Sequence, residues 1–442
     1  SMIDNFRSVP TDCPLRDERL GWEGDAQVFA ATASYLADIF GFMDKYMADT
    51  RDSQSTDGNF DDRAPNNKPR ESPVGGWSDA GVIIPYLMYR QSGDKEFIKS
   101  NYAAMKRYAD LIISIFSKNN YIDVDIPNTF GKNTYGDWLG VETTPCVITE
   151  TAFGEHSFRL LSEMAGIIGK DSDRDYLAGM ADRVKAAWNR EFVLPDGSTK
   201  CDPKVYGTGY WGNSKHPDTG EVNTQCSWVV GLAFGLFDEK TAPLAAKKLA
   251  SSVISGGYNI KVGFLGVGLI LPVLTMNGYS DAAFRMLRQT TCPSWLYQVK
   301  NGATSIYECW DGYYEEDGKI TYKGSLNHYS YGAAVEWLFS HVLGIRGKAP
   351  GFGEIILSPT VNQDLGRASG HYNSIRGKIA SEWAFEDDGL VCRFEIPANT
   401  RAKIYLPESG KWIGSKAPEN PFEVTDKPII VGSGKYEFRL VK

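Results

Sequence analysis

The sequence has no apolar run long enough to cross a membrane. Its most apolar stretch, residues 262–275, is 14 residues long and is interrupted by three glycines and one proline. A membrane-spanning helix needs about 20 consecutive apolar residues. This stretch therefore predicts a buried helix, and no membrane partner is expected.

Histidine and cysteine are also scarce, with five and seven copies in 442 residues. The cysteines are odd in number and are not closely paired with one another or with histidine, which argues against a disulfide framework or a metal site. We predict free, buried thiols, no metal and no cofactor. Cys13 and Cys309 fall inside the two acidic motifs described below, and we interpret both as structural.

Positive charge is in deficit. The chain has 47 lysines and arginines against 55 acidic residues, a net charge of −8. This balance argues against nucleic acid or an anionic membrane as a partner. Aromatic side chains, in contrast, are abundant, with 23 tyrosines and 11 tryptophans. A surface of this kind suits neutral sugars better than phosphates.

Residues 11–25, TDCPLRDERLGWEGD, hold the densest group of chemically useful side chains. Besides arginines and Trp22, the stretch carries four carboxylates that matter here: Asp12, Asp17, Glu18 and Asp25. Proline and glycine interrupt it, so we predict a shaped loop. Carboxylates accept hydrogen bonds from hydroxyls and tryptophan stacks on the C–H face of a pyranose, which favours a sugar subsite. The alternative is a solvated acidic turn with Asp25 as the N-cap of the next helix.

Helical periodicity dominates the chain up to residue 343. Loops rich in glycine and aromatic residues repeatedly precede pairs of helices, and no strand pattern intervenes. The helices are predicted over 26–47, 80–91, 96–117, 149–168, 174–191, 224–237, 240–254, 267–276, 280–289 and 331–343. This recurrence predicts an (α/α)6 barrel whose loops converge on one face. The alternative is an ordinary large helical domain with an aromatic core.

After residue 344 the pattern changes to a period of two. Short alternating runs separated by turn residues predict strands at 353–357, 390–396, 402–406 and 435–440. We therefore predict two domains, the barrel over residues 1–347 and a small antiparallel β-sandwich over residues 348–442.

A second acidic cluster occurs at residues 303–312, ATSIYECWDG. Glu308 has Tyr307, Trp310 and Asp311 as neighbours. A carboxyl group among aromatic rings is desolvated, which is one way in which a catalytic acid or base is tuned. The alternative is a surface acid on a hairpin. A ring of helices would bring Glu308 close to Glu18, 290 positions earlier.

The motifs TDCPLRDERLGWEGD, GGWSDA, YGDW, GFLG, YECWDG and NHYSYGA together resemble the bacterial α-L-rhamnosidases of glycoside hydrolase family 78. They occur in the family's order and cover essentially the whole chain. The resemblance implies an (α/α)6 barrel and an inverting hydrolase that releases terminal α-L-rhamnose from a glycan or glycoside.

The resemblance also implies roles for individual residues. Glu18 would be the general acid and Glu308 the general base. The residues that hold the sugar would be Asp12, Arg16, Trp22, Asp25, Trp77, Trp138 and His328. Core packing is the alternative for the tryptophans, and capping of the last helix is the alternative for His328.

Two other classes of function stay open at this point. One is a sugar-binding protein on the same barrel without turnover, and the other is a polysaccharide lyase. Ser1-Met2 looks like a cloning remnant, and no secretory signal follows it. We expect the native N-terminus to lie upstream, and the sequence is compatible with the periplasm or the cytoplasm of a bacterium. It leaves the oligomeric state open.

Overall fold

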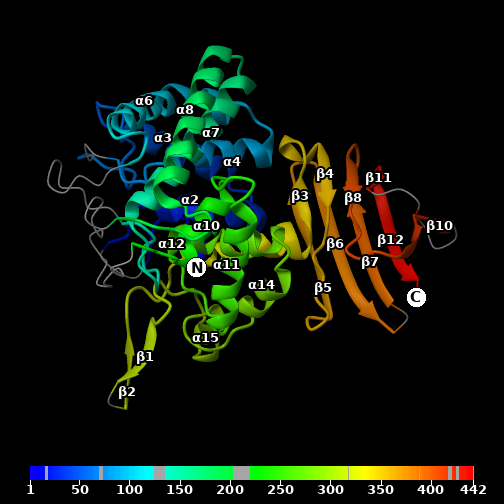
Figure 1. Ribbon diagram of the computed structural model, residues 1–442. Helices are drawn as coiled ribbons and strands as arrows, with labels where there is room; N and C mark the ends of the chain where they lie inside the picture. The colour runs from blue at the N-terminus through cyan, green and yellow to red at the C-terminus, as the bar shows by residue number, and fades with distance from the viewer. Residues whose placement is uncertain are drawn as a thin grey trace. The chain divides into compact units, whose positions relative to one another are not determined.

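The structure, a computed structural model, describes residues 1–14, 18–68, 73–123, 135–202, 220–316, 318–387, 389–416, 421–424 and 428–441 (Figure 1). Two compact units share these residues. The helical unit comprises residues 1–30, 41–86 and 97–333, and the sheet unit comprises residues 31–40, 87–96 and 334–442. The domain boundary predicted at 347/348 stays a prediction.

The chain up to residue 333 is mostly helical. Its helices are α1 (Met2–Asn5), α2 (Glu23–Leu36), α3 (Phe40–Asp52), α4 (Ala80–Ser92), α5 (Glu96–Lys99), α6 (Tyr102–Lys118), α7 (Cys146–Ile167), α8 (Asp171–Phe192), α10 (Gln225–Ala233), α11 (Ala242–Ser255), α12 (Phe264–Val267), α13 (Ile270–Met276), α14 (Ser280–Leu287) and α15 (Trp295–Lys300). No helix among the described residues is long and apolar enough to span a bilayer.

Helices α7 and α8 show how the core of the helical unit is built. Most side chains of α7 are buried, whereas α8 buries one face only, with Leu177, Val184 and Trp188 on it. This is the pattern of a central helix covered by an amphipathic one. The indole Nε1 of Trp188 donates to the carbonyl oxygen of Ile148 at 3.1 Å and fixes the pair together.

Several predictions about helices were wrong, and the helix predicted over 96–117, for example, is two helices, α5 and α6. The helix predicted over 26–47 is two helices, α2 and α3. The Asp38 carboxylate accepts a hydrogen bond from the Phe40 N–H at 3.3 Å, so that Asp38 acts as a start signal for α3. The helix predicted over 331–343 is a succession of a 3₁₀ turn (Ser330–Ala334), an α turn (Val335–Trp337) and a π turn (Leu338–Val342).

The expectation that no strand lies within the helical region was also wrong. Strands β1 (Tyr313–Glu316) and β2 (Lys319–Tyr322) form an antiparallel hairpin that extends away from the helices in Figure 1. Tyr313 lies opposite Tyr322, with ring centroids 6.1 Å apart. The tyrosines suit a strand, but a run of only four residues is too short to show a clear period.

The sheet unit contains two sheets, and β3 of one contacts β6 of the other. The strands are β3 (Ile345–Gly347), β4 (Glu354–Leu357), β5 (Arg367–Ser374), β6 (Gly377–Glu386), β7 (Gly389–Ile396), β8 (Arg401–Ile404), β9 (Lys411–Ser415), β10 (Pro421–Glu423), β11 (Ile429–Val431) and β12 (Gly434–Val441). Their order is β10-β9-β12-β7-β6-β5 in one sheet and β11-β8-β4-β3 in the other.

The predicted antiparallel pairing holds for most neighbours but not for all. Strand β4 pairs with β8 in parallel, which corrects the prediction of a purely antiparallel sandwich. The chain between these two strands forms β5, β6 and β7 of the other sheet, and such a crossover allows β8 to return in the same direction as β4.

A hollow of about 390 Å³ lies on one face of the six-stranded sheet. Arg393 is one of its lining residues and has acids on both neighbouring strands. Its guanidinium bonds to Glu437 at 2.8 Å and to Glu382 and Glu386 at 2.7 Å each. The register puts Arg393 opposite both Glu382 and Glu437, so these charges are paired with one another.

Candidate active site

A pocket of about 200 Å³ in the helical unit collects residues from six separate stretches of the chain. It is lined by Asp12, Glu18, Trp22, Asp25, Trp77, Tyr135, Trp138, Phe264, Glu308 and His328. Eight of the nine predicted site residues are in this group. The ninth, Arg16, lies outside the described residues.

Two hydrogen bonds between Asp12 and Leu20 close the first loop. The N–H of Asp12 donates to the carbonyl of Leu20, and the N–H of Leu20 donates to Oδ1 of Asp12, both at 3.0 Å. The indole Nε1 of Trp22 donates to Oε1 of Glu18 at 2.9 Å. The loop therefore presents Asp12 and Glu18 together, with Trp22 orienting the Glu18 carboxyl group.

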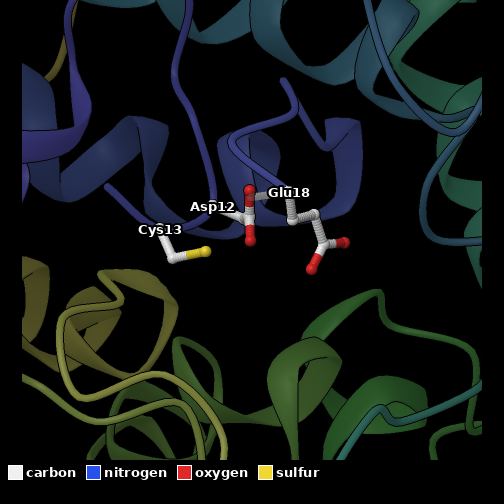
Figure 2. Close-up of side chains that lie close together, drawn as sticks. All are labelled: Asp12, Cys13 and Glu18. Carbon is white, nitrogen blue, oxygen red and sulfur yellow. The ribbon is translucent and has the colours of Figure 1, made fainter. Parts of the chain in front are cut away.

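Cys13 stands beside these two acids. The ligand atoms of Asp12, Cys13 and Glu18 all lie within 4.8 Å of one another. Figure 2 shows the Cys13 sulfur directed toward the Asp12 carboxylate, with Glu18 on its other side. Burial raises the pKa of Asp12, while a hydrogen bond from the Cys13 side chain opposes this shift and the charges of Asp25 and Glu18 add to it. Six of the seven cysteines are buried, but Cys292 is exposed, contrary to the prediction of buried thiols.

Asp25 and His328 form a buried pair. Nε2 of His328 lies 3.0 Å from Oδ1 of Asp25, and the Ser330 hydroxyl donates to the same oxygen at 3.0 Å. Burial alone would lower the pKa of His328, but the carboxylates of Asp25, Glu308 and Asp12 raise it overall. Asp25 lies in the first turn of α2, so the alternative of Asp25 as the helix N-cap is wrong.

Glu308 is buried, with 7% of its surface exposed, which rules out the alternative of a surface acid. The N–H of Glu308 donates to the carbonyl of Ser325 at 2.9 Å, and the N–H of Ser325 donates to Oε2 of Glu308 at 2.8 Å. Gly324 has φ of +67°, and a Cβ atom there would lie only 3.0 Å from Oε2 of Glu308. The glycine thus allows this turn to lie against the carboxylate.

Aromatic rings form the other half of the pocket, and Tyr135 is at their centre. Its ring centroid lies 4.9 Å from that of Trp77, 5.6 Å from that of Trp22 and 5.9 Å from that of Trp138. Its hydroxyl donates to Oδ2 of the buried Asp62 at 2.7 Å. The three tryptophans therefore line the pocket together with Tyr135, in addition to any packing role.

Sequence reasoning missed Tyr135 and Phe264 as lining residues. Both lie inside motifs that stand out in the sequence, YGDW and GFLG. Tyrosine and phenylalanine are common in protein cores, so their types alone carried no signal. Their position next to a glycine in these motifs was the available signal.

Asp79 does not line the pocket, but its buried carboxylate holds the loop that carries Trp77. Asp79 accepts hydrogen bonds from the N–H of Gly76 at 2.7 Å and from the hydroxyls of Ser157 and Tyr108 at 2.5 and 3.2 Å. Burial raises the pKa of Asp79 to about 6. This carboxylate closes the turn that carries Trp77.

The pocket thus has an acidic half and an aromatic half, and none of its lining residues is a lysine or an arginine among those described. Such a site suits a neutral ligand with hydroxyls on one face and C–H groups on the other. Two carboxyl groups on loops far apart in the sequence, Glu18 and Glu308, can act on one bond between them.

Comparison with known proteins shows the family of the chain. Residues 1–342 match the family described as the bacterial alpha-L-rhamnosidase 6 hairpin glycosidase domain, and residues 344–417 match the bacterial alpha-L-rhamnosidase C-terminal domain. The chain belongs to the bacterial α-L-rhamnosidase family. The predicted family is thereby confirmed.

Individual relatives are similar over nearly the whole chain. An alpha-L-rhamnosidase of Streptomyces avermitilis is 33% identical over 91% of this chain and 36% of its own length. A crystal structure of a Streptomyces avermitilis alpha-L-rhamnosidase complexed with L-rhamnose has a TM-score of 0.85 at 30% identity and covers 98% of this chain and 40% of that chain. The alpha-L-rhamnosidase of Dictyoglumus thermophilum also has a TM-score of 0.85, at 27% identity, covering 100% of this chain and 48% of that one. The chain thus spans less than half the length of these relatives.

Proposed function

We propose that the chain is an inverting glycoside hydrolase that releases terminal α-L-rhamnose from a glycan or glycoside. The observation that carries this proposal is the meeting of Glu18 and Glu308 in one pocket that aromatic rings also line. Membership of the α-L-rhamnosidase family supports it. The proposal includes an (α/α)6 barrel over residues 1–347, which the name of the matching six-hairpin family supports, and a β-sandwich over residues 348–442.

Inversion needs a carboxylic acid on the glycosidic oxygen and a carboxylate that activates water on the opposite face of the sugar. We assign the first role to Glu18 and the second to Glu308. Trp22 orients Glu18 and the Ser325 N–H orients Glu308, so both groups are positioned before the sugar arrives. We predict that the two carboxyl groups stand roughly 6.5–9.5 Å apart in the sugar complex, leaving room for a water molecule.

The acidic half of the pocket would bind the ring hydroxyls. Asp12 and Asp25 are acceptors for them, and Arg16 would orient these carboxylates. His328 is held by Asp25 through Nε2, whereas its buried Nδ1 has no hydrogen-bond partner among the described residues. As an imidazolium, His328 would offer this Nδ1–H to a sugar oxygen.

The aromatic half would accept the C–H face and the C6 methyl group of rhamnose against Trp22, Trp77 and Trp138. The indole N–H of Trp22 already donates to Glu18, and the Tyr135 hydroxyl already donates to Asp62. A C6 hydroxyl, as in mannose, would lose its hydration against these groups. We expect this to favour rhamnose over mannose by roughly 1–3 kcal/mol.

A panel of nitrophenyl glycosides tests the proposed function. We expect release of nitrophenol from the α-L-rhamnoside and slower release from the α-L-mannoside, which differs from it only by the C6 hydroxyl. L-Rhamnose binding without release would indicate a sugar-binding protein. A product from uronate polymers that absorbs in the ultraviolet would indicate a lyase. Either of these results would contradict the proposal.

A further inference from the structure

The short helix α12 carries the pocket residue Phe264, and residues of a distant loop hold its first turn. The N–H of Gly263 donates to Oδ2 of Asp137 at 2.6 Å, and the N–H of Gly266 donates to Oδ1 at 3.1 Å. The N–H of Leu265 also bonds to the Asp137 carboxylate. The Phe264 N–H donates to the carbonyl of Trp138 at 3.0 Å.

Successive amide groups at the start of a helix have no partner within that helix and are usually satisfied by a local cap. Here the cap comes from residues 137–138, more than 120 positions earlier. Trp138 and Phe264 both line the pocket. The cap therefore joins the backbones of two pocket residues that are remote in sequence.

Close contacts restrict the movement of Phe264 relative to Trp138. A Cβ atom at residue 263 would collide with the carbonyl oxygens of Asp137 and Trp138, so the glycine is required for the close approach. Behind Phe264, the Tyr331 ring lies 5.3 Å from its ring, and the Tyr331 hydroxyl donates to the Leu139 carbonyl at 3.0 Å. A shift of Phe264 relative to Trp138 would break several of these contacts together.

We propose that Asp137 is a positioning residue that sets the sugar affinity of the pocket by fixing Phe264 to Trp138. The inference rests on the proposed function, since it concerns the binding of the sugar in that pocket. Asp137 does not line the pocket, so it acts only through its neighbours. Its loss should weaken ground-state and transition-state binding alike, which raises KM and spares kcat.

Asp137→Asn is the test, with Glu142→Gln as its matched control. An amide keeps the shape of the carboxylate but turns one oxygen into an NH₂ group that faces a backbone N–H. Glu142 follows the loop of Asp137 and bonds to Lys261, which precedes α12, and to the Gln225 N–H at the start of α10, at 2.8 Å each. None of these three residues lines the pocket. We expect Asp137→Asn to raise KM for an α-L-rhamnoside about tenfold while kcat changes less than about threefold, and Glu142→Gln to change neither. An unchanged KM, a loss of kcat alone, or an equal effect of Glu142→Gln would overturn the inference.

A double-mutant cycle with Phe264→Leu shows whether Asp137 acts through Phe264. If it does, the effect of Asp137→Asn on KM becomes small once Phe264 has been replaced. Fully additive effects would overturn the route through Phe264.

Hydrogen exchange of the amides of residues 263–266 gives a readout that does not depend on activity. We expect slow exchange in the unmodified protein and faster exchange in Asp137→Asn, with Glu142→Gln unchanged at these amides. Unchanged exchange in Asp137→Asn would show that the Asp137 carboxylate does not hold these amides, and would overturn the inference whether or not the protein is active. Faster exchange in Asp137→Asn, in a protein that is inactive on every rhamnoside, would show that Asp137 is only a structural cap. That result would overturn both its role in sugar affinity and the proposed function.

Discussion

The two hollows of this molecule differ in how their charges are satisfied. The hollow on the six-stranded sheet is the larger, about 390 Å³ against about 200 Å³ for the pocket of the helical unit. Among its lining residues, Arg393 is paired with Glu382 and with Glu437. In the pocket, Asp12, Glu18 and Glu308 are held by N–H and S–H donors, and no described lining residue is a lysine or an arginine.

This difference says more about function than size does. Exposed ion pairs across a sheet stabilise a fold modestly and leave no group poised for reaction. A group of carboxylates with no lysine or arginine in the described lining is costly, and such costs are tolerated where the chemistry needs them. We therefore place the reaction in the smaller hollow.

The largest effect is expected from Glu308→Gln. Water activation is needed for every substrate, so kcat should fall by about 10⁴-fold on nitrophenyl and alkyl rhamnosides alike. Asp311→Asn is the matched control, because this exposed acid lies three residues away and bonds to Lys323. Steady-state kinetics decides the matter, and an active Glu308→Gln enzyme would remove Glu308 from the mechanism.

Glu18→Gln should have an effect that depends on the leaving group. We expect a loss of about 10²–10³-fold on alkyl rhamnosides, whose departing oxygen needs a proton, and a much smaller loss on nitrophenyl rhamnosides. A plot of kcat/KM against leaving-group pKa should be steeper for the variant than for the unmodified enzyme. Equal slopes would contradict the role of general acid.

A third prediction concerns Asp79, a buried carboxylate that accepts hydrogen bonds from two hydroxyls and a backbone N–H. Because burial raises its pKa to about 6, the folded state retains a proton that the unfolded state releases near pH 4. The contribution of Asp79 to the free energy of unfolding is thus fully present below about pH 4 and is lost as pH rises through about 6, by roughly 3 kcal/mol.

Urea unfolding at several pH values tests this sign. Asp79→Asn should flatten the decline in stability between about pH 4 and 6, and the exposed Asp110→Asn should leave it unchanged. A steeper decline in Asp79→Asn would show that the Asp79 carboxyl stabilises the fold in its charged form, contrary to the expectation.

The smallest effect is expected in the other hollow. Arg393→Gln removes three ion pairs, but the Arg393 side chain is 32% exposed and its partners are at least as exposed. We expect the free energy of unfolding to fall by about 1 kcal/mol or less, with kcat and KM for rhamnosides unchanged. A large loss of activity would show that the sheet hollow takes part in the function.

Much of the fold was readable from the sequence because helices such as α7 and α8 run for 22 residues each, long enough for the apolar α7 and the amphipathic α8 to be recognised. The break between α2 and α3 was not readable from the sequence, because apolar residues continue through it and Asp38 alone marks the start of the second helix. Short strands such as β9, β10 and β11 show little of a period, but β5 and β6, with eight and ten residues, were also missed. The parallel pairing of β4 with β8 depends on a crossover that no local pattern reports.

The candidate site was readable where its residues stand in dense motifs. Glu18 and Asp25 lie in one such motif, and the structure brings them into one pocket with Glu308 and His328. Their roles stay predictions. The supporting groups were not readable, since Asp62 holds Tyr135 from 73 positions away and Asp137 holds Gly263 from 126 positions away. Contacts of this kind arise from the tertiary fold.

The central claim is that Glu18 and Glu308 cleave an α-L-rhamnoside with inversion. Time-resolved proton NMR of the released sugar tests it most directly, because each anomer has its own H1 signal and mutarotation is slower than the first turnovers of an active enzyme. The account predicts β-L-rhamnose as the first product, with the α-anomer growing in later. The α-anomer as the first product would contradict it.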